Sequence, residues 1–122
     1  MESTLSRPVL SAGTLIGDPV RNPAGETLGR IKEFMIDTRN GRIAYAVLSV
    51  GGFLGLGDSL FAIPWNMLQV DPEDRCFLLD VSKEQLENAD GFDPDHWPDM
   101  ADLDWANRIH THYGATPHWS LP

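Results

Sequence analysis

The pattern of apolar and polar positions predicts one strand that is buried on both sides. Residues 42–50 read RIAYAVLSV, and in an extended strand the side chains on both faces of this segment are mostly apolar. Such a strand is expected to be covered on both faces. Residues 51–57 combine four glycines with three large apolar side chains, which predicts a shaped turn. A short apolar strand is expected next, at Ser59–Ile63, and Pro64 ends its ladder.

The residues before this strand predict a long hairpin partner. In Thr27–Asp37 the apolar positions change parity near Lys32–Phe34, which indicates a β-bulge. Asn40-Gly41 then follows, and this dipeptide is typical of a tight hairpin turn. Further upstream, we expect Pro19 to confine the segment Leu15–Arg21 to an edge or a bent position.

Short elements are expected after the apolar strands. The sequence predicts a helical turn at Trp65–Met67, and strands at Leu68–Val70 and Cys76–Val81. Ser82 and Gln85 form a capping box, in which each side chain bonds the backbone amide of the other, so a short helix begins there. About six short strands punctuated by turns indicate a small sandwich or barrel.

The last part of the chain has a different pattern. Apolar residues recur there at steps of three and four, which predicts a helix over residues 98–113 that begins near Pro98 and ends at Gly114. Its apolar stripe consists of Met100, Leu103, Ala106, Ile109 and Tyr113. A lone helix of this length is marginal in water, so we expect it to dock on the barrel, with Asp102 on its wet face. The predicted units are therefore a barrel domain at 11–89 and a helical extension at 90–122.

Several of these blocks resemble the PRC-barrel family. The run Gly51–Asp58 followed by Phe61–Trp65 carries the resemblance, and residues 17–20 and 25–31 fit the family's opening strands. The family is named for the cytoplasmic domain of the photosynthetic reaction-centre H subunit. It includes the C-terminal domain of a ribosome-maturation factor and many small stand-alone bacterial proteins. The resemblance implies a small, mostly antiparallel β-barrel used for assembly, with no shared catalytic residues to carry over.

Composition and charge narrow the function classes. The 122 residues suit one domain, and the single cysteine, Cys76, excludes an internal disulfide. No apolar run approaches the roughly 20 residues of a membrane span and no signal-peptide pattern is present, so we expect a cytoplasmic protein without membrane insertion. The net charge of −9, from 18 acidic and 9 basic residues, argues against direct nucleic-acid binding.

Candidate chemistry is sparse in this sequence. The glycine-rich run lacks the Lys-Ser/Thr ending of a phosphate-binding loop. His110 and His112 stand two apart, so on a helix they point in different directions and cannot chelate one metal together. We expect them, with His96 and His118, to be solvated. The carboxylates of 90–104 are expected to form a solvated acidic face, and no nucleophile-base set is apparent, so we predict neither an enzyme nor a cofactor or metal.

The sequence therefore favours a non-catalytic assembly or adaptor module that binds protein partners, with itself first, as a homodimer. A small barrel can cover only one apolar face of residues 42–50, and the glycine-rich run is apolar as well.

The predicted partner-binding residues are Phe53, Leu54, Leu56, Tyr45, Trp105 and Trp119. The predicted turn-shaping residues are Gly51, Gly52, Gly55, Gly57 and Pro64, and we expect a positive φ at Gly51, Gly55 or Gly57. The tail tryptophans can equally pin the tail on the chain's own barrel. The alternative is a small-ligand or metal-binding regulator that uses the His/Asp-rich C-terminal region.

Overall fold

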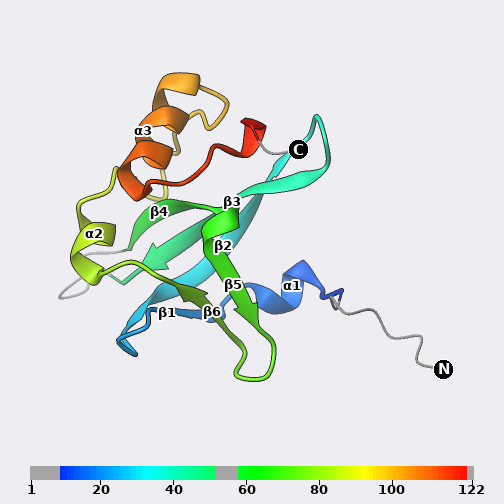
Figure 1. Ribbon diagram of the computed structural model, residues 1–122, viewed down its shortest axis with the longest axis vertical. Coiled ribbons are helices and arrows are strands. Elements are labelled where there is room, and N and C mark those ends of the chain that lie inside the picture. Colours follow the sequence, from blue (N-terminus) through cyan, green and yellow to red (C-terminus); the bar gives the residue numbers. More distant parts are fainter. Residues whose placement is uncertain (1–8, 52–57, 121–122) are drawn as a thin grey trace.

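The protein is mainly β, with six strands in one mixed sheet of order β4-β3-β2-β1-β6-β5 (Figure 1). This computed structural model describes residues 9–51 and 58–120. The strands are β1 (Pro19–Arg21), β2 (Thr27–Asp37), β3 (Arg42–Val50), β4 (Ser59–Pro64), β5 (Leu68–Asp71) and β6 (Cys76–Leu79). The helices are α1 (Ala12–Leu15), α2 (Lys83–Glu87) and α3 (Leu103–Tyr113), with the 3-10 helices η2 (Trp65–Met67) and η3 (His118–Ser120).

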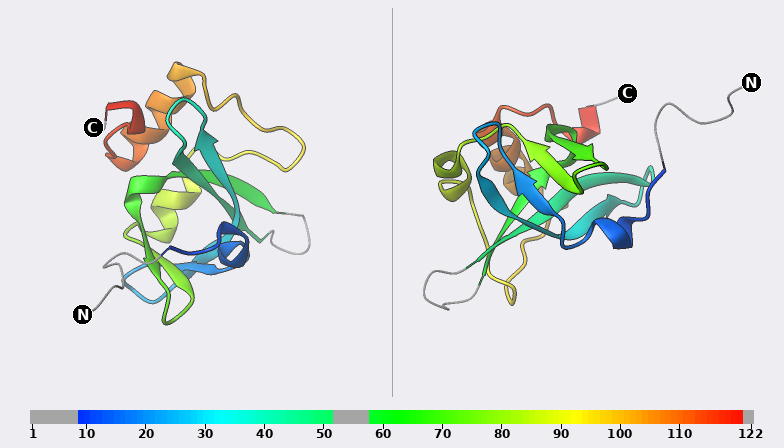
Figure 2. Two further views of the ribbon diagram at one scale, coloured as in Figure 1. Left: turned by 90° about the vertical axis from the view of Figure 1, so that its right-hand side faces the viewer. Right: turned by 90° about the horizontal axis from the view of Figure 1, so that it is seen from below.

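The sheet is strongly curled but is not closed by hydrogen bonds (Figure 2). Its pairs are antiparallel except β1 with β6, which run parallel. Within the described residues, β4 and β5 form the two ends of the strand order and do not pair with each other. The predicted antiparallel barrel is thus confirmed only in part, since the sheet is mixed and open.

Of the two predicted positions for Pro19, an edge or a bend, the structure shows only the bend. β1 lies inside the sheet between β2 and β6, where the sequence predicts an edge or a bend. Pro19 is the first residue of β1, and the pairing with β6 begins only at Val20, so its missing N–H leaves that ladder intact. A register shift after Val20 gives the bend that was expected. Leu15 lies in α1 rather than in a strand.

The β2–β3 hairpin confirms the predicted bulge. Ile31 pairs with Leu48 and Glu33 with Val47, so Lys32 is the extra residue on β2. The hairpin itself is also confirmed, although its loop spans residues 38–41 and is longer than a two-residue turn. Gly41 has φ 74° and donates its N–H to the Asp37 carbonyl at 2.8 Å.

Both faces of β3 are covered, as the apolar pattern predicts, but the second cover comes from the chain itself. Ala46 and Leu48 point to one face, where they pair with β2 and β4 residues of the core. Tyr45 points to the other face, and its ring lies against Trp105 of α3 at 5.3 Å between centroids. Figure 1 shows α3 lying over β3 and β4. The inference that one face of β3 is left for a second copy of the chain is therefore wrong.

Only one of the two hydrogen bonds of the predicted capping box is present at the start of α2. Ser82 accepts a hydrogen bond from the Gln85 amide at 3.0 Å, as predicted. The Gln85 side chain does not reach back to Ser82 but donates to the His112 carbonyl of α3 at 3.5 Å. His112 returns a hydrogen bond from its Nε2 to the Gln85 carbonyl at 2.7 Å. These two contacts tie α2 to α3.

Helix α3 begins later than predicted, and its buried face is rotated. It starts at Leu103 with Asp102 as N-cap, whose carboxylate accepts from the Asp104 amide at 2.9 Å, and it ends at the left-handed Gly114 as predicted. Pro98 lies outside the helix. Leu103 was expected in the apolar stripe but is 60% exposed. The buried side chains of α3 are Trp105, Ala106, Ile109, His110 and Tyr113.

Candidate functional site

A cluster of aromatic and imidazole rings joins β3, α3 and the C-terminal segment. We call it the ring cluster, and its members are Tyr45, Trp105, His110, His118 and Trp119. The Tyr45 ring lies 5.6 Å from His110 and 5.4 Å from His118, while Trp119 lies 5.1 Å from His110, all between centroids. These edge-on contacts hold the C-terminal segment against the sheet.

The ring cluster contains buried polar atoms without hydrogen-bond partners. Nδ1 of His110 lies 2.8 Å from the Ala106 carbonyl, and since a carbonyl only accepts, that nitrogen carries the proton. Nε2 of His110, Nδ1 of His118 and Oη of Tyr45 are buried and have no protein partner. Burial raises the pKa of Tyr45 to about 12 and is the main reason that the pKa of His118 is lowered. Unpartnered buried groups are costly, so they mark this region as a candidate site.

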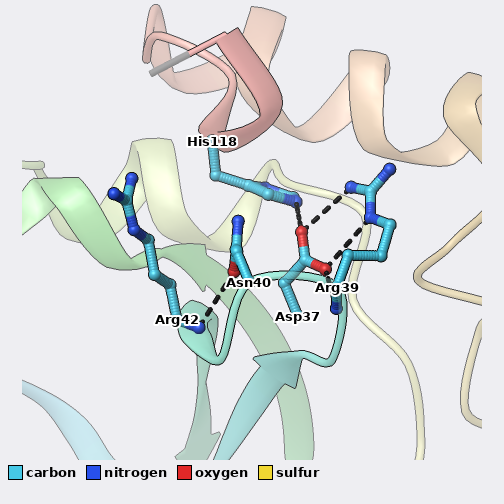
Figure 3. A network of polar contacts seen from close by, with 5 residues as sticks. All are labelled: Asp37, Arg39, Asn40, Arg42 and His118. Atoms are coloured by element: carbon cyan, nitrogen blue, oxygen red, sulfur yellow. Dashed lines mark hydrogen bonds and ion pairs between the residues drawn. The ribbon is translucent and has the colours of Figure 1, made fainter. Parts of the chain in front are cut away.

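His118 also connects the C-terminal segment to the β2–β3 hairpin (Figure 3). Its Nε2 lies 3.7 Å from Oδ2 of Asp37, which is beyond hydrogen-bond distance, and the two side chains form an ion pair only when His118 is protonated. Asp37 accepts from Nη2 of Arg39 at 2.9 Å and from Nε at 3.1 Å. The Arg39 hydrogen bonds lower the pKa of Asp37 to about 2. Asp37 is therefore an ionised ion-pair member at neutral pH.

Two hollows flank the ring cluster. The larger, about 620 Å³, lies between the β2–β3 hairpin, the start of α3 and the C-terminal segment, and we call it the hairpin groove. Its lining includes Met35, Ile36, Asp37, Arg39, Met100, Leu103, Ala106, His118 and Trp119. The smaller, about 290 Å³, is the histidine pocket, lined by Asn40, Arg42, Ile43, Ala44, Pro64, Trp65, Asn66, His110 and His118. Both volumes are in or near the range of ligand and side-chain binding sites.

Comparison with known proteins identifies the family to which this architecture belongs. Residues 8–86 match the family model of the PRC-barrel domain. The chain belongs to the PRC-barrel family. This confirms the resemblance seen in the glycine-rich run and the strands around it.

Among solved structures, this PRC-barrel protein is similar to RimM of Pseudomonas aeruginosa, a protein assigned to 16S ribosomal RNA processing. The two share 19% sequence identity with a TM-score of 0.43. The match covers 65% of this chain and 48% of that one, so it spans about half of the RimM length. No curated protein matched the chain.

Three of the six predicted partner-binding residues of this PRC-barrel protein lie in the described part of the chain, in two different environments. Tyr45 and Trp105 are buried, 1% and 6% exposed, so they pack the core rather than form a surface. Trp119 is half-buried and lines the hairpin groove. Phe53, Leu54 and Leu56 lie outside the described residues, as do Gly52, Gly55 and Gly57.

The two remaining turn residues have clear positions. Pro64 is the buried last residue of β4, pairing with Tyr45, so it ends that strand as predicted. Gly51 does not have a positive φ; the described glycines that do are Gly17, Gly25, Gly41 and Gly114. The expected positive φ is therefore absent at Gly51, and the other two candidates lie outside the described residues.

The histidines are not all solvated, contrary to the expectation. His110 is 2% exposed and His118 is half-buried, whereas His96 is exposed beside Asp93. Within residues 9–51 and 58–120, no group of three or more His, Cys, Asp or Glu side chains is placed to hold a metal ion. In the same residues, no helix is long and apolar enough to cross a bilayer.

Sequence reasoning missed most of the residues that line the two hollows. Ile36 and Arg42 were assigned only to strands, and Asn40 only to the hairpin turn. A signal for Ile36 does exist, since it follows Phe34 and Met35 in an apolar run of three. In a strand such a run must send at least one side chain to the outer face.

Proposed function

We propose that this PRC-barrel protein is a non-catalytic assembly module that binds protein partners in the hairpin groove, with a second copy of the chain as the first partner to test. The observation that carries the proposal is the exposure of two large apolar side chains in one hollow. Ile36 of β2 is 52% exposed and Leu103 of α3 is 60% exposed, and both line the groove. Apolar side chains gathered at an exposed hollow are typical of protein interfaces.

The other side chains of the groove suit a docking surface. Met35 and Met100 are flexible and polarisable, so they can adapt to an incoming side chain. Trp119 adds an aromatic wall of the kind that anchors interfaces. An apolar anchor of a partner would therefore meet apolar surface on both sides of the groove.

The charge around the groove favours a basic partner. Asp99, Asp102 and Asp104 are exposed and stand next to Met100 or Leu103 in the sequence. Among the described residues, the one arginine that lines the groove, Arg39, is paired with Asp37. A partner segment with apolar anchors flanked by lysine or arginine would complement this rim. A second copy of the chain would instead bring its own acidic rim. Added salt should therefore weaken binding of a basic partner and strengthen self-association.

The titratable groups of the groove support the non-catalytic part of this proposal. Asp37 is held by Arg39 with a pKa of about 2, which makes it a poor general base near neutral pH. The PRC-barrel resemblance also implies no shared catalytic residue set. Binding rather than chemistry is what both observations favour.

The test is capture of binding proteins from the native lysate by matched variants. Ile36→Asp and Leu103→Asp place a charge in the groove, and Leu78→Asp places one at a 39% exposed position that lines neither hollow. We expect the proteins held by the wild type and by Leu78→Asp to be lost from both groove variants. If all three variants hold the same proteins, the groove is not the binding surface.

Self-association is tested separately by light scattering at micromolar concentration. We expect a dimer mass for the wild type and for Leu78→Asp, and a monomer mass for Leu103→Asp. A monomer mass for the wild type across the concentration range would remove the second copy from the proposal. It would leave binding of other proteins to be decided by the capture experiment.

A further inference from the structure

The C-terminal segment, residues 115–120, forms a wall that the two hollows share. His118 lines both the hairpin groove and the histidine pocket, and Trp119 lines the groove. Figure 1 shows the segment leaving the end of α3 and running back toward the tip of the β2–β3 hairpin. The position of this segment therefore decides whether the hairpin groove has a wall on that side.

Ring contacts and single polar contacts hold the C-terminal segment in place. Within residues 9–51 and 58–120, no residue after α3 belongs to a strand or to a β-bridge. Asn66 of η2 donates its NH₂ group to the Thr116 carbonyl at 2.9 Å. His118 and Trp119 meet rings of β3 and α3 edge-on, at 5.4 and 5.1 Å between centroids. A terminal segment docked in this way can open without unfolding the sheet.

Docking of the C-terminal segment buries polar atoms that water would otherwise bond. Nδ1 of His118 has no hydrogen-bond partner among the described residues, and neither has Oη of Tyr45, the ring beside it. Both atoms can bond water once the segment leaves. This penalty opposes the ring contacts, so the docked and released forms are closer in free energy than the ring contacts alone suggest.

Protonation of His118 increases this penalty. It places an N–H at the buried Nδ1, where no acceptor lies among the described residues. Burial is the main reason that the pKa of His118 is lowered; His110 and Arg39 act in the same direction, and Asp37 acts in the opposite one. The titratable and charged groups that face His118 are Asp37, Arg39 and Arg42 of the hairpin, Tyr45 of β3 and His110 of α3.

We propose that the C-terminal segment is a pH-sensitive latch of the hairpin groove, docked while His118 is neutral and released when His118 is protonated. The released segment binds a proton at the ordinary histidine pKa, near 6.5, and the docked segment binds it only at lower pH. Release is therefore favoured as the pH falls below about 6.5, and the groove then loses the wall that Trp119 supplies. The effect on bound proteins rests on the proposed function, whereas the release itself does not.

The experiment on release is ¹⁹F NMR of the full chain labelled with fluorotryptophan, in a series from about pH 7.5 to about pH 5.5. The spectrum of Trp119→Phe assigns the Trp119 signal. Trp65, whose ring packs on two phenylalanines of the sheet, reports whether the sheet stays folded. His118→Gln removes the titrating ring, and His96→Gln is its matched control, since His96 is exposed and lines neither hollow.

We expect the Trp119 signal to move to a solvent-exposed position as the pH falls, while the Trp65 signal keeps its folded position. His118→Gln should abolish this movement, and His96→Gln should leave it unchanged. Release is overturned if the Trp119 signal does not move, if it moves equally in His118→Gln, or if the Trp65 signal moves with it because the whole chain unfolds.

A second pair of variants changes the docking without touching the titrating ring. Asn66→Ala removes the hydrogen bond to Thr116, so it should raise the ratio of released to docked segment by about fivefold and shift the midpoint of the Trp119 movement upward by about half a pH unit or more. Asn107→Ala is its control, since Asn107 is exposed on α3 and lines neither hollow. Equal midpoints in the two variants would also overturn release.

The effect on the groove is measured by capture of proteins from the native lysate along the same pH series. Proteins bound at about pH 7.5 should leave as the Trp119 signal moves, and they should leave Asn66→Ala at a higher pH than Asn107→Ala. Proteins that stay bound after the Trp119 signal has moved would overturn the latch. Capture of no protein at about pH 7.5 would overturn the proposed function and the role of the latch with it, while the ¹⁹F signals would still decide whether the segment is released.

Discussion

Replacing Ile109 by alanine tests whether α3 supports the fold, and Leu103→Ala is its matched control. Each change removes three carbon atoms from the same 11-residue helix. Ile109 is 1% exposed and Leu103 is 60% exposed. The amphipathic pattern alone places both side chains on one stripe, so only the structure separates the two variants.

The magnitude follows from this burial. Three buried carbons at ~0.8 kcal/mol each give ~2.4 kcal/mol for Ile109→Ala, and the cavity that remains brings the loss into the range of about 2–5 kcal/mol. Leu103→Ala should cost the single chain less than about 1 kcal/mol, since most of that side chain is exposed when no partner is bound. Small domains have a total stability of roughly 5–15 kcal/mol, so the first loss is a large fraction.

Urea denaturation followed by tryptophan fluorescence measures both losses in the free energy of unfolding. The account predicts one cooperative transition with a lower midpoint for Ile109→Ala. If the two variants lose the same stability, α3 is not docked through Ile109 and the described packing is wrong. If Ile109→Ala unfolds α3 alone while the sheet keeps its transition, the extension does not support the barrel-like sheet.

Three further predictions test other contacts. Asp102→Ala should cost about 1 kcal/mol because it removes the α3 N-cap, and Asp102→Asn should restore most of that loss; equal losses would exclude capping as the cause. Gly29→Ala should destabilise the protein by about 1–3 kcal/mol, because its Cβ would lie 2.5 Å from the Ser49 backbone oxygen, and an unchanged melting temperature would contradict this contact. Burial lowers the pKa of His118 below its ordinary value of 6.5, so the unfolded chain binds the proton first, and the free energy of unfolding should fall as the pH drops below about 6.5. His118→Gln should flatten that fall, and a profile unchanged by the substitution would contradict the assignment to His118.

Local patterns in the sequence predict the hairpin region well. Three features there follow from the order of apolar, polar and turn residues within a few positions. They are the strand at 42–50, the extra residue at Lys32 and the turn at Trp65–Met67. Position within the sheet depends on distant partners. The parallel pairing of β1 with β6 brings Val20 beside Phe77, and nothing near Pro19 encodes it.

The candidate site was predicted less well for the same reason. Tyr45 and Trp105 were both predicted to bind a partner, but they contact each other in the core instead of forming a surface. His110 is buried because rings from β3 and the C-terminal segment enclose it, and no spacing within α3 reveals this. The exposure of Leu103 depends on how α3 is rotated on the sheet, which helical periodicity specifies only to within about one residue position.

Site-specific photo-crosslinking in the native cell tests the hairpin groove most directly. A photoreactive phenylalanine analogue replaces Ile36, Leu103 or, as a control, Leu78, and the crosslinked products are identified by mass spectrometry. The account predicts that positions 36 and 103, on opposite elements of the groove, crosslink to the same protein while position 78 does not. Crosslinks that are the same at position 78, or that are missing at both groove positions, would contradict the claim that the groove binds the partner.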